Sequence, residues 1–575
     1  MARTGDPATR SSSDEPPEGG GGTPDELADE AAEEASLPLE HGGGARRGGG
    51  GRIRSAIDSV LPRREFGDQR DILGGAGQNV IGLVAGVLAT FVTQIVMTRT
   101  LGASIFGVVT VATQFAFIAS AATRFGMDVA NVRLVAILDG RGERGRMRGL
   151  VRKSAGIAIV VSLIAAALTF LFAGPLGNAL TSLPDQGKAA FWAAAYTIPF
   201  AAVTWTYLGA TRGLKIMRHT LYIFWIGQPV GWIAFALAGW LIAKTAGITT
   251  FAYGLSWTVA AVLAWWAWER ETRGFDARTD AGGIPEERLG ALLKFGGLRA
   301  PATLFAQLLF WTDLFVLARF APSGTVGVYG ATVRTAQSLL LFLTSLSLVF
   351  SPFVADLHAR GERDKLDALY KNVTRWGLAA TMPVLLALAI LPDVILRVFG
   401  ERFTAGDEAM VILIVGMVVP VCVGTVGFIL IMVGRTGWDL LVYAGSFVID
   451  IGIAFALARP SVLGMKGAAI AQACTLTFSA VARLFLVRKF VHIWPFDRWF
   501  LRLAPAVVAG GLAMWGMHQV LAGPKWLIDL GGSVLAGLAV YTVVLILTGL
   551  KPGERRTLMS LGRRLTGRGA GRPAA

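Results

Sequence analysis

Long runs of apolar residues dominate the sequence from Ile72 onward, and short polar or charged stretches separate them. Each run has roughly 20 residues, the length at which an α-helix crosses the ~30 Å hydrocarbon core of a bilayer. The pattern predicts an all-α, polytopic membrane protein with fourteen transmembrane helices. These spans are expected at residues 73–98, 105–127, 150–173, 189–210, 220–243, 247–268, 299–320, 326–350, 376–399, 408–433, 438–458, 466–488, 503–521 and 526–549.

Basic residues fall mainly on one side of these spans. With the N-terminus placed in the cytoplasm, forty of the 54 Lys and Arg residues flank the cytoplasmic side and nine flank the outer side. Because cytoplasmic loops retain an excess of Lys and Arg, this bias predicts a plasma-membrane protein with both termini in the cytoplasm. The outer loops are all short, which leaves no room for an extracellular catalytic domain.

Composition supports a membrane protein and argues against a nucleic-acid partner. Of the 575 residues, 53% are hydrophobic and only 16% are charged, whereas soluble domains carry roughly 25% charged residues. Residues 1–40 hold eleven acids and two arginines, a net charge of −9, so the rest of the chain carries +24 and the whole chain +15. Such an excess in a membrane protein reflects topology.

The sequence offers no pattern for a bound metal, a cofactor or an enzymatic centre. A phosphate-binding G-x-x-x-x-G-K-[ST] loop and an H-E-x-x-H motif are both absent. The two cysteines, Cys422 and Cys474, lie inside apolar runs at no metal-ligand spacing. We therefore expect a protein that is not an enzyme and that uses no cofactor and no metal.

The two halves of the apolar region resemble each other at an offset of about 220 residues. The turn before Gly107 matches the turn before Gly327, and Pro199 matches Pro420. Because each unit holds an even number of spans, both units insert in the same orientation, which predicts two six-helix lobes about a pseudo-twofold axis along the membrane normal. The alternative is a chance recurrence of glycine and proline.

The repeat defines the predicted division of the chain. An acidic, Gly-rich cytoplasmic tail with a basic juxtamembrane segment (1–71) precedes an N-terminal six-helix lobe (72–268). A cytoplasmic inter-lobe linker (269–298) joins it to a C-terminal six-helix lobe (299–490). Two additional transmembrane helices (491–550) and a basic cytoplasmic tail (551–575) follow.

Six short motifs occur in an order that resembles the polysaccharide-export family of lipid-linked oligosaccharide flippases, within the multidrug/oligosaccharidyl-lipid/polysaccharide exporter superfamily. The motifs are LGASIFG (101–107), TRGLKIM (211–217), WTDLFVLARF (311–320), GVYGATVR (327–334), SPFVADL (351–357) and VFGERF (398–403). The resemblance covers about residues 73–490, and the acidic tail departs from the usual pattern.

This resemblance implies a transporter that moves an undecaprenyl-diphosphate-linked oligosaccharide from the inner to the outer leaflet by alternating access. Such a flippase would serve capsule, exopolysaccharide or O-antigen biosynthesis, with the lipid-linked substrate, membrane lipids and polysaccharide polymerase or assembly proteins as partners. Alternatives are a multidrug or peptidoglycan-precursor exporter of the same superfamily and a membrane-embedded glycan polymerase. A scaffolding role agrees less well with charges inside several spans.

Charged residues inside spans are costly and therefore indicate function or specific pairing. Arg334 is the one basic residue expected well inside a span, and Asp313 is expected at a similar depth in the preceding span. A planar guanidinium suits the oxygens of a diphosphate, so Arg334 is a candidate substrate site, with Asp313 orienting the substrate or gating. Alternatively, the two residues form a buried ion pair between spans 7 and 8.

Other polar residues complete the candidate site. Asp450, in the middle of span 11, is a candidate for coupling transport to an ion gradient, or else it bonds a neighbouring helix. Amide side chains can donate to and accept from a glycan; those available in the spans are Gln78, Asn79, Gln94, Gln114, Gln307 and Gln337. Arg124, at the cytoplasmic mouth of span 2, would meet an incoming diphosphate or serve only as a basic flank.

Overall fold

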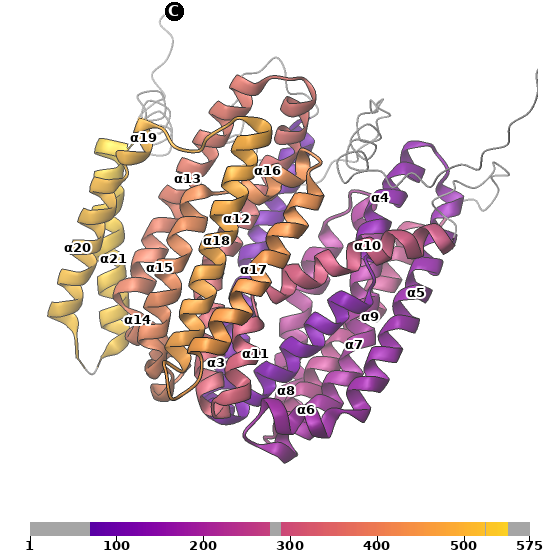
Figure 1. Ribbon diagram of the computed structural model, residues 1–575, viewed down its shortest axis with the longest axis horizontal. Helices are drawn as coiled ribbons and strands as arrows, with labels where there is room; N and C mark the ends of the chain where they lie inside the picture. The colour runs from indigo at the N-terminus through magenta and orange to yellow at the C-terminus, as the bar shows by residue number, and fades with distance from the viewer. Residues whose placement is uncertain (1–68, 276–288, 524, 550–575) are drawn as a thin grey trace, which may run out of the picture. The chain divides into compact units, whose positions relative to one another are not determined.

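The computed structural model describes residues 69–275, 289–523 and 525–549, all within one compact unit, and every regular element in these ranges is helical (Figure 1). The first half contains α3 (Gln69–Thr123), α4 (Met127–Gly140), α5 (Arg144–Leu171), α6 (Ala173–Leu180), α7 (Pro184–Gly213), η2 (Thr220–Gly227), α8 (Gln228–Gly239) and α9 (Ala246–Glu271).

The second half follows after residue 288 and ends in a separate helix pair. It contains α10 (Leu289–Leu308), α11 (Thr312–Phe320), α12 (Ser323–Ala359), α13 (Arg363–Ile390), α14 (Pro392–Leu396), η4 (Arg397–Phe399), η5 (Glu401–Gly406), α15 (Asp407–Val423), α16 (Val426–Met432), α17 (Thr436–Leu457) and α18 (Met465–Val491). The last elements are α19 (Arg498–Leu501), α20 (Ala504–Leu521), α21 (Trp526–Val544) and η6 (Leu545–Gly549). Residues 1–68 and 551–575 of the predicted tails and residues 276–288 of the predicted linker lie outside the described residues.

The structure confirms an all-helical, multi-pass membrane protein. Among the described residues, ten helices are long and apolar enough to cross a membrane. Each of the fourteen predicted spans falls mainly on one helix or on consecutive helical elements. One of the ten helices, Ala85–Thr123, holds two predicted spans joined at a bend. The count of fourteen stays a prediction.

Helix α3 folds back on itself at Gly102. In a straight helix Gln94 and Gln114 would lie about 30 Å apart, yet both line one cavity. The turn requires a φ of 71° at Gly102, a conformation that residues with a Cβ rarely adopt. The glycine of the LGAS motif therefore allows two antiparallel arms to form within one continuous helical segment.

The predicted span at 299–320 is broken in two. Helix α10 packs on α3 and α4 of the first half, where Phe295 lies in a cluster with Met127, and it also contacts α17 of the second half. Helix α11 packs mainly on α17 and α18. Between them, Leu309 to Trp311 leave the helical conformation. The predicted span thus contacts both halves and is broken near its middle.

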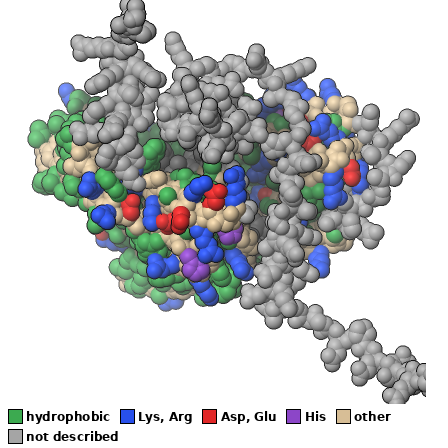
Figure 2. Space-filling model, turned by 90° about the horizontal axis from the view of Figure 1, so that it is seen from above, with side chains coloured by type: hydrophobic (Ala, Val, Ile, Leu, Met, Phe, Trp, Pro, Cys, Tyr) green, Lys and Arg blue, Asp and Glu red, His purple; other side chains and the backbone are tan. Residues whose placement is uncertain are grey.

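Charged side chains gather at one end of the helices, which we call the basic end (Figure 2). Here Arg148 Nη2 donates to the carbonyl of Thr272 at 2.6 Å, joining α5 to the end of α9. Glu271 accepts from Arg218 at 2.6 Å and contacts His219 at 3.0 Å. Burial alone would raise the pKa of Glu271, but these two partners lower it below its usual value. The charge bias predicts that this end faces the cytoplasm; the opposite end is called the Gly102 end.

Helices α20 and α21 pack closely on each other and stand beside α13 (Figure 1). Gly510 faces Tyr541 and Gly537 faces Met514, so the two helix backbones can approach closely. His518 Nδ1 contacts the buried Asp529 carboxylate at 2.9 Å. These two helices follow the second half in the sequence, and the predicted division of the chain stays a prediction.

Besides Arg334, the basic residues Arg375 and Arg483 lie buried within described helices, contrary to the expectation from sequence. Arg483 of α18 is 8% exposed, and its Nε donates to Asp439 of α17 at 2.7 Å. Its guanidinium also lies 4.3 Å from the centroid of the Tyr443 ring. The sequence pattern places Arg483 among the basic residues that flank a span end. Its depth depends on pairing with Asp439, which composition alone does not reveal.

Removing one partner of this ion pair is expected to destabilise the protein strongly. Arg483→Leu leaves the Asp439 carboxylate buried without its cation, at a cost of about 3–5 kcal/mol. The double variant Asp439→Leu/Arg483→Leu removes both charges and is expected to be markedly more stable than Arg483→Leu. Chemical unfolding in detergent, followed by fluorescence, measures both. A double variant less stable than the single one would contradict this account.

Candidate functional site

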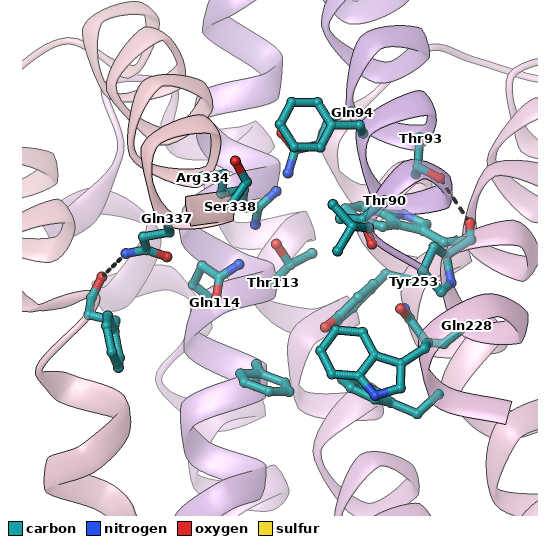
Figure 3. Close-up of a pocket in the computed structure, with 18 of the residues that line it drawn as sticks. Thr90, Thr93, Gln94, Thr113, Gln114, Gln228, Tyr253, Arg334, Gln337 and Ser338 are labelled. Atoms are coloured by element: carbon teal, nitrogen blue, oxygen red, sulfur yellow. Dashed lines mark hydrogen bonds between the residues drawn. The ribbon is translucent and has the colours of Figure 1, made fainter. Parts of the chain in front are cut away.

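A cavity of about 420 Å³ lies between helices of the two halves (Figure 3). Its wall combines α3, η2, α8 and α9 of the first half with α12 and the α10–α11 break of the second half. Most of the wall is apolar or aromatic, including Trp225, Trp232, Trp257 and Trp311. The polar residues that line it are Thr90, Thr93, Gln94, Thr113, Gln114, Gln228, Tyr253, Arg334, Gln337 and Ser338. A mostly apolar pocket with a few convergent polar groups is typical of a ligand site.

Arg334 is the only charged residue among the described residues that line this cavity. It projects from α12, and its guanidinium lies 5.5 Å from the centroid of the Trp311 ring, which provides a cation–π contact. Because no carboxylate is among the described lining residues, their net charge is a single positive charge at a place of low dielectric constant. The arrangement favours an anionic ligand over a cationic one.

Asp313 and Arg334 are not paired with each other in the described structure. Asp313, fully buried in α11, accepts a hydrogen bond from the Tyr329 hydroxyl of α12. Arg334 lies over Trp311 and faces the cavity, as Figure 3 shows. The described conformation therefore does not contain the buried ion pair that was one of the two alternatives. Arg334 lines the cavity, and Asp313 lies in a separate buried cluster.

Asp450 belongs to the same buried cluster as Asp313. Both residues are 0% exposed, and the Asp450 carboxyl faces the backbone N–H of Asp313. Thr475 of α18 donates to Asp450 Oδ1 at 3.3 Å. Asp313 Oδ1 and Asp450 Oδ2 have no hydrogen-bond partner. Two buried carboxylates in one cluster repel each other, so the cluster favours uptake of a proton or a small cation.

The predicted amide residues divide into three groups. Gln94, Gln114 and Gln337 line the cavity together with Arg334. Gln307 lies in α10 and does not line it. Gln78 and Asn79 fall in α3, but their side chains lie outside the part of the chain that the structure describes. Three of the predicted polar side chains thus meet at one place.

Arg124 lies away from the cavity, at the junction of α3 and α4. Its Nε lies 3.4 Å from the Asp128 carboxylate, and both residues are 6% exposed. The Arg124 guanidinium stacks 5.0 Å from the Trp205 ring centroid, and Arg212 approaches the same ring at 5.6 Å. These contacts join α3, α4 and α7, so Arg124 does more than flank a span end.

The α10–α11 break exposes a backbone carbonyl that two glutamines satisfy. Gln337 Nε2 of α12 donates to the carbonyl of Phe310 at 3.1 Å, and Gln472 Nε2 of α18 donates to it at 3.4 Å. A carbonyl freed from its helix needs such partners inside a membrane. Gln337 therefore helps to hold the break that presents Trp311 to the cavity.

The two halves touch through a pair of glycines between the cavity and the Gly102 end. A Cβ on Gly107 would overlap the carbonyl oxygen of Ser323, and a Cβ on Gly327 would overlap that of Ala103. Each hypothetical Cβ would also lie 2.9 Å from the backbone nitrogen of the other glycine. The contact is reciprocal. Gly107 and Gly327 are 220 residues apart, as are Ala103 and Ser323, which is the offset of the predicted repeat.

Further contacts close the same end. The backbone N–H of Ser182 donates to Ser323 Oγ and that of Ser323 donates to Ser182 Oγ, both at 2.9 Å. Arg99 Nε donates to the carbonyl of Val398 at 2.8 Å. The rings of Phe106 and Phe403 meet edge to face, with centroids 6.1 Å apart. The halves are thus joined between the cavity and the Gly102 end.

Sequence reasoning missed the contribution of η2, α8 and α9 to the site. Gln228 lines the cavity and donates to Ser256 Oγ at 3.2 Å. Tyr253 and Trp257 of α9 line it as well. Spans 5 and 6 are rich in aromatic residues, but nothing in one sequence shows which face of a helix meets the cavity.

This chain is similar to one known protein family and to one characterised bacterial protein. The profile of a family described as "Polysaccharide biosynthesis protein" matches residues 74–358. Stage V sporulation protein B of Bacillus subtilis (strain 168) is 23% identical over 518 residues, which cover 84% of this chain and 96% of that protein.

Two solved transporters share the fold. An inward-facing multidrug resistance MATE family transporter of the MOP superfamily matches with a TM-score of 0.59 at 14% identity, over 71% of this chain and 94% of that one. Lipid II flippase MurJ in an inward closed conformation matches with a TM-score of 0.57 at 14% identity, over 80% of this chain and 98% of that one. At this identity the likeness shows the fold alone.

Proposed function

We propose that this chain is a flippase for lipid-linked oligosaccharide of the polysaccharide-export family, which its similarity to the polysaccharide biosynthesis family over residues 74–358 supports. It carries an undecaprenyl-diphosphate-linked glycan from the cytoplasmic to the outer leaflet of the plasma membrane for polysaccharide biosynthesis. The diphosphate and the adjoining sugar occupy the cavity while the isoprenoid chain stays in the bilayer.

The observation that carries this proposal is the lone Arg334 in the cavity. A diphosphate offers several oxygens to the forked guanidinium, and Trp311 on one side fixes its plane. Amide and hydroxyl side chains around it can exchange hydrogen bonds with sugar hydroxyls. The aromatic walls supply flat apolar surfaces that exclude water.

Two alternatives differ from this proposal in their ligand. An exporter of cationic drugs needs a negative site, and no carboxylate is among the described residues that line the cavity. A peptidoglycan-precursor flippase carries the same diphosphate chemistry and shares the fold of one match. Depletion of the protein separates the three functions. Loss of a precursor flippase stops growth, and loss of a drug exporter makes cells sensitive to cationic dyes. We expect cells depleted of this protein to grow and to keep their resistance to such dyes.

Transport proceeds by alternating access between the two halves. The Gly107–Gly327 contact and the Ser182–Ser323 pair close one end in the described conformation. The charge bias favours the outer side for that end, and in this proposal the cavity therefore opens toward the cytoplasmic side in this state. Opening requires the halves to separate at the glycine pair.

The buried carboxyls Asp313 and Asp450 couple this motion to an ion gradient. They stand on α11 and α17, and α11 adjoins the break whose Trp311 contacts Arg334. Uptake of a proton or small cation removes their repulsion and stabilises the packing of α11 on α17 and α18. Loading of the cluster thereby biases the position of Trp311 at the cavity.

Asp450→Asn is expected to uncouple transport from the ion gradient. The amide cannot ionise, so transport in proteoliposomes should lose its dependence on pH and on an imposed gradient. Asp313→Asn should do the same, whereas Asp393→Asn, in the short α14 outside the cluster, should behave as the wild type. Retention of the normal gradient dependence by Asp450→Asn would rule out this coupling site.

A further inference from the structure

The cavity has two chemically different sides. On α12 and the adjoining break, Arg334, Ser338 and Trp311 form the side that carries the cation. On the opposite side, which α3, α8 and α9 supply, the described lining residues are uncharged, and they include Gln94, Gln228 and Tyr253 (Figure 3). A ligand with a charged part and an uncharged hydroxyl-rich part matches this division.

Most polar groups on the uncharged side already have partners inside the protein. Thr93 Oγ1 donates to the carbonyl of Pro229 at 3.2 Å, and Gln228 Nε2 donates to Ser256 Oγ at 3.2 Å. These bonds hold α3 against α8 and α8 against α9. They shape the wall and leave little capacity for a ligand on those particular atoms.

Gln94 differs from these neighbours. It lines the cavity, it is only 3% exposed, and its Oε1 has no hydrogen-bond partner. A buried acceptor without a donor is costly, and native proteins rarely keep one without a reason. The amide stands on the arm of α3 that precedes Gly102, across the cavity from the α12 side (Figure 3).

We propose that Gln94 is the specificity-determining contact of a sugar subsite, where its amide oxygen accepts a hydroxyl or amide N–H from the sugar next to the diphosphate. Arg334 then holds the diphosphate and Gln94 reads the first sugar. The aromatic rings of Trp225 and Trp232 face the apolar C–H surface of that sugar. This inference rests on the proposed function, because it assumes that the diphosphate lies at Arg334.

Binding of short substrate pieces to the purified protein tests this subsite. Farnesyl diphosphate serves as the bare probe, and farnesyl diphosphates carrying glucose, galactose or N-acetylglucosamine serve as sugar probes. We expect at least one sugar probe to bind the wild type about tenfold more tightly than the bare probe, the effect of one well-placed hydrogen bond. Gln94→Leu should abolish this preference and leave the affinity for the bare probe unchanged.

Matched variants separate the subsite from the diphosphate site. Gln307→Leu, a glutamine of α10 outside the cavity, should keep the sugar preference. Arg334→Gln should weaken both kinds of probe together. If the wild type binds the bare probe but no sugar probe more tightly, the sugar subsite is wrong and the proposed function stands. If the wild type fails to bind the bare probe, the proposed function itself fails.

One more variant guards against misfolding. Gln94→Glu keeps an acceptor oxygen at the same position, so it should keep the preference for the sugar probe even if its overall affinity falls. Should Gln94→Leu bind neither probe, this variant decides the question. A Gln94→Glu protein that binds the bare probe without preferring the sugar probe would overturn the assignment, as would a Gln94→Leu protein with an unchanged preference.

Discussion

Arg334→Gln is expected to lower transport of the diphosphate-linked glycan about ten- to a hundredfold. Arg334 is the only charge on the described cavity wall, so its loss leaves the diphosphate with neutral donors alone. Hydrogen bonds to charged groups contribute about 1.5–3 kcal/mol each, and 1.4 kcal/mol corresponds to a factor of ten. Initial rates in proteoliposomes loaded with labelled substrate measure the effect.

Two further variants define the role of Arg334. Arg334→Lys keeps the charge but loses the planar fork and the stacking on Trp311, so it should fall between the wild type and Arg334→Gln. Arg319→Gln removes an exposed arginine at the end of α11 and should transport normally. Full transport by Arg334→Gln would remove the observation on which the proposed function depends.

Gly327→Ala is expected to abolish transport by preventing closure at the Gly102 end. Its Cβ would overlap the backbone carbonyl of Ala103, and a backbone atom in a packed helix cannot move aside cheaply. Gly107→Ala should have the same effect, because its Cβ would meet the carbonyl of Ser323. A single cysteine introduced at Val326, which is 1% exposed in the closed state, should become reactive toward a thiol reagent in both variants.

A glycine with open space around it provides the control. A Cβ on Gly156 of α5 meets nothing within 4 Å, so Gly156→Ala should leave transport and the reactivity of the cysteine unchanged. The reporter is placed in a chain lacking Cys422 and Cys474, the two cysteines of the sequence. If Gly327→Ala transports normally and keeps position 326 protected, the reciprocal glycine contact does not close the cavity.

The helical architecture could be predicted from sequence because its signals are local. Apolar runs give the spans, and Gly102 in the LGAS motif gives the turn between two of them. The 220-residue offset also matches Gly107 with Gly327 from the sequence alone, and the structure shows that these two glycines are in contact. What could not be predicted is the break at Phe310, because its carbonyl is satisfied by Gln472, a residue 162 positions away.

The candidate site shows the same limit. Arg334 stands out in sequence because a cation inside a span is rare, and the structure places it on the cavity. The sequence pattern predicts Arg483 to be a flanking residue, whereas in the structure it pairs with Asp439 inside the protein. For Gln94, Gln228 and Gln307 the residue type is identical, and only the direction of each helix face decides that the first two line the cavity. Such directions arise from packing between helices, which one sequence does not encode locally.

The central claim concerns the side of the membrane on which lipid-linked glycan accumulates. In cells depleted of this protein, glycan is labelled on intact cells and, separately, after lysis, with wild type or Arg334→Gln supplied in trans. The account predicts that depleted cells and cells with Arg334→Gln accumulate lipid-linked glycan reachable only after lysis, and that the wild type restores labelling on intact cells. Normal amounts of lipid-linked glycan on the outer face of depleted cells would contradict it.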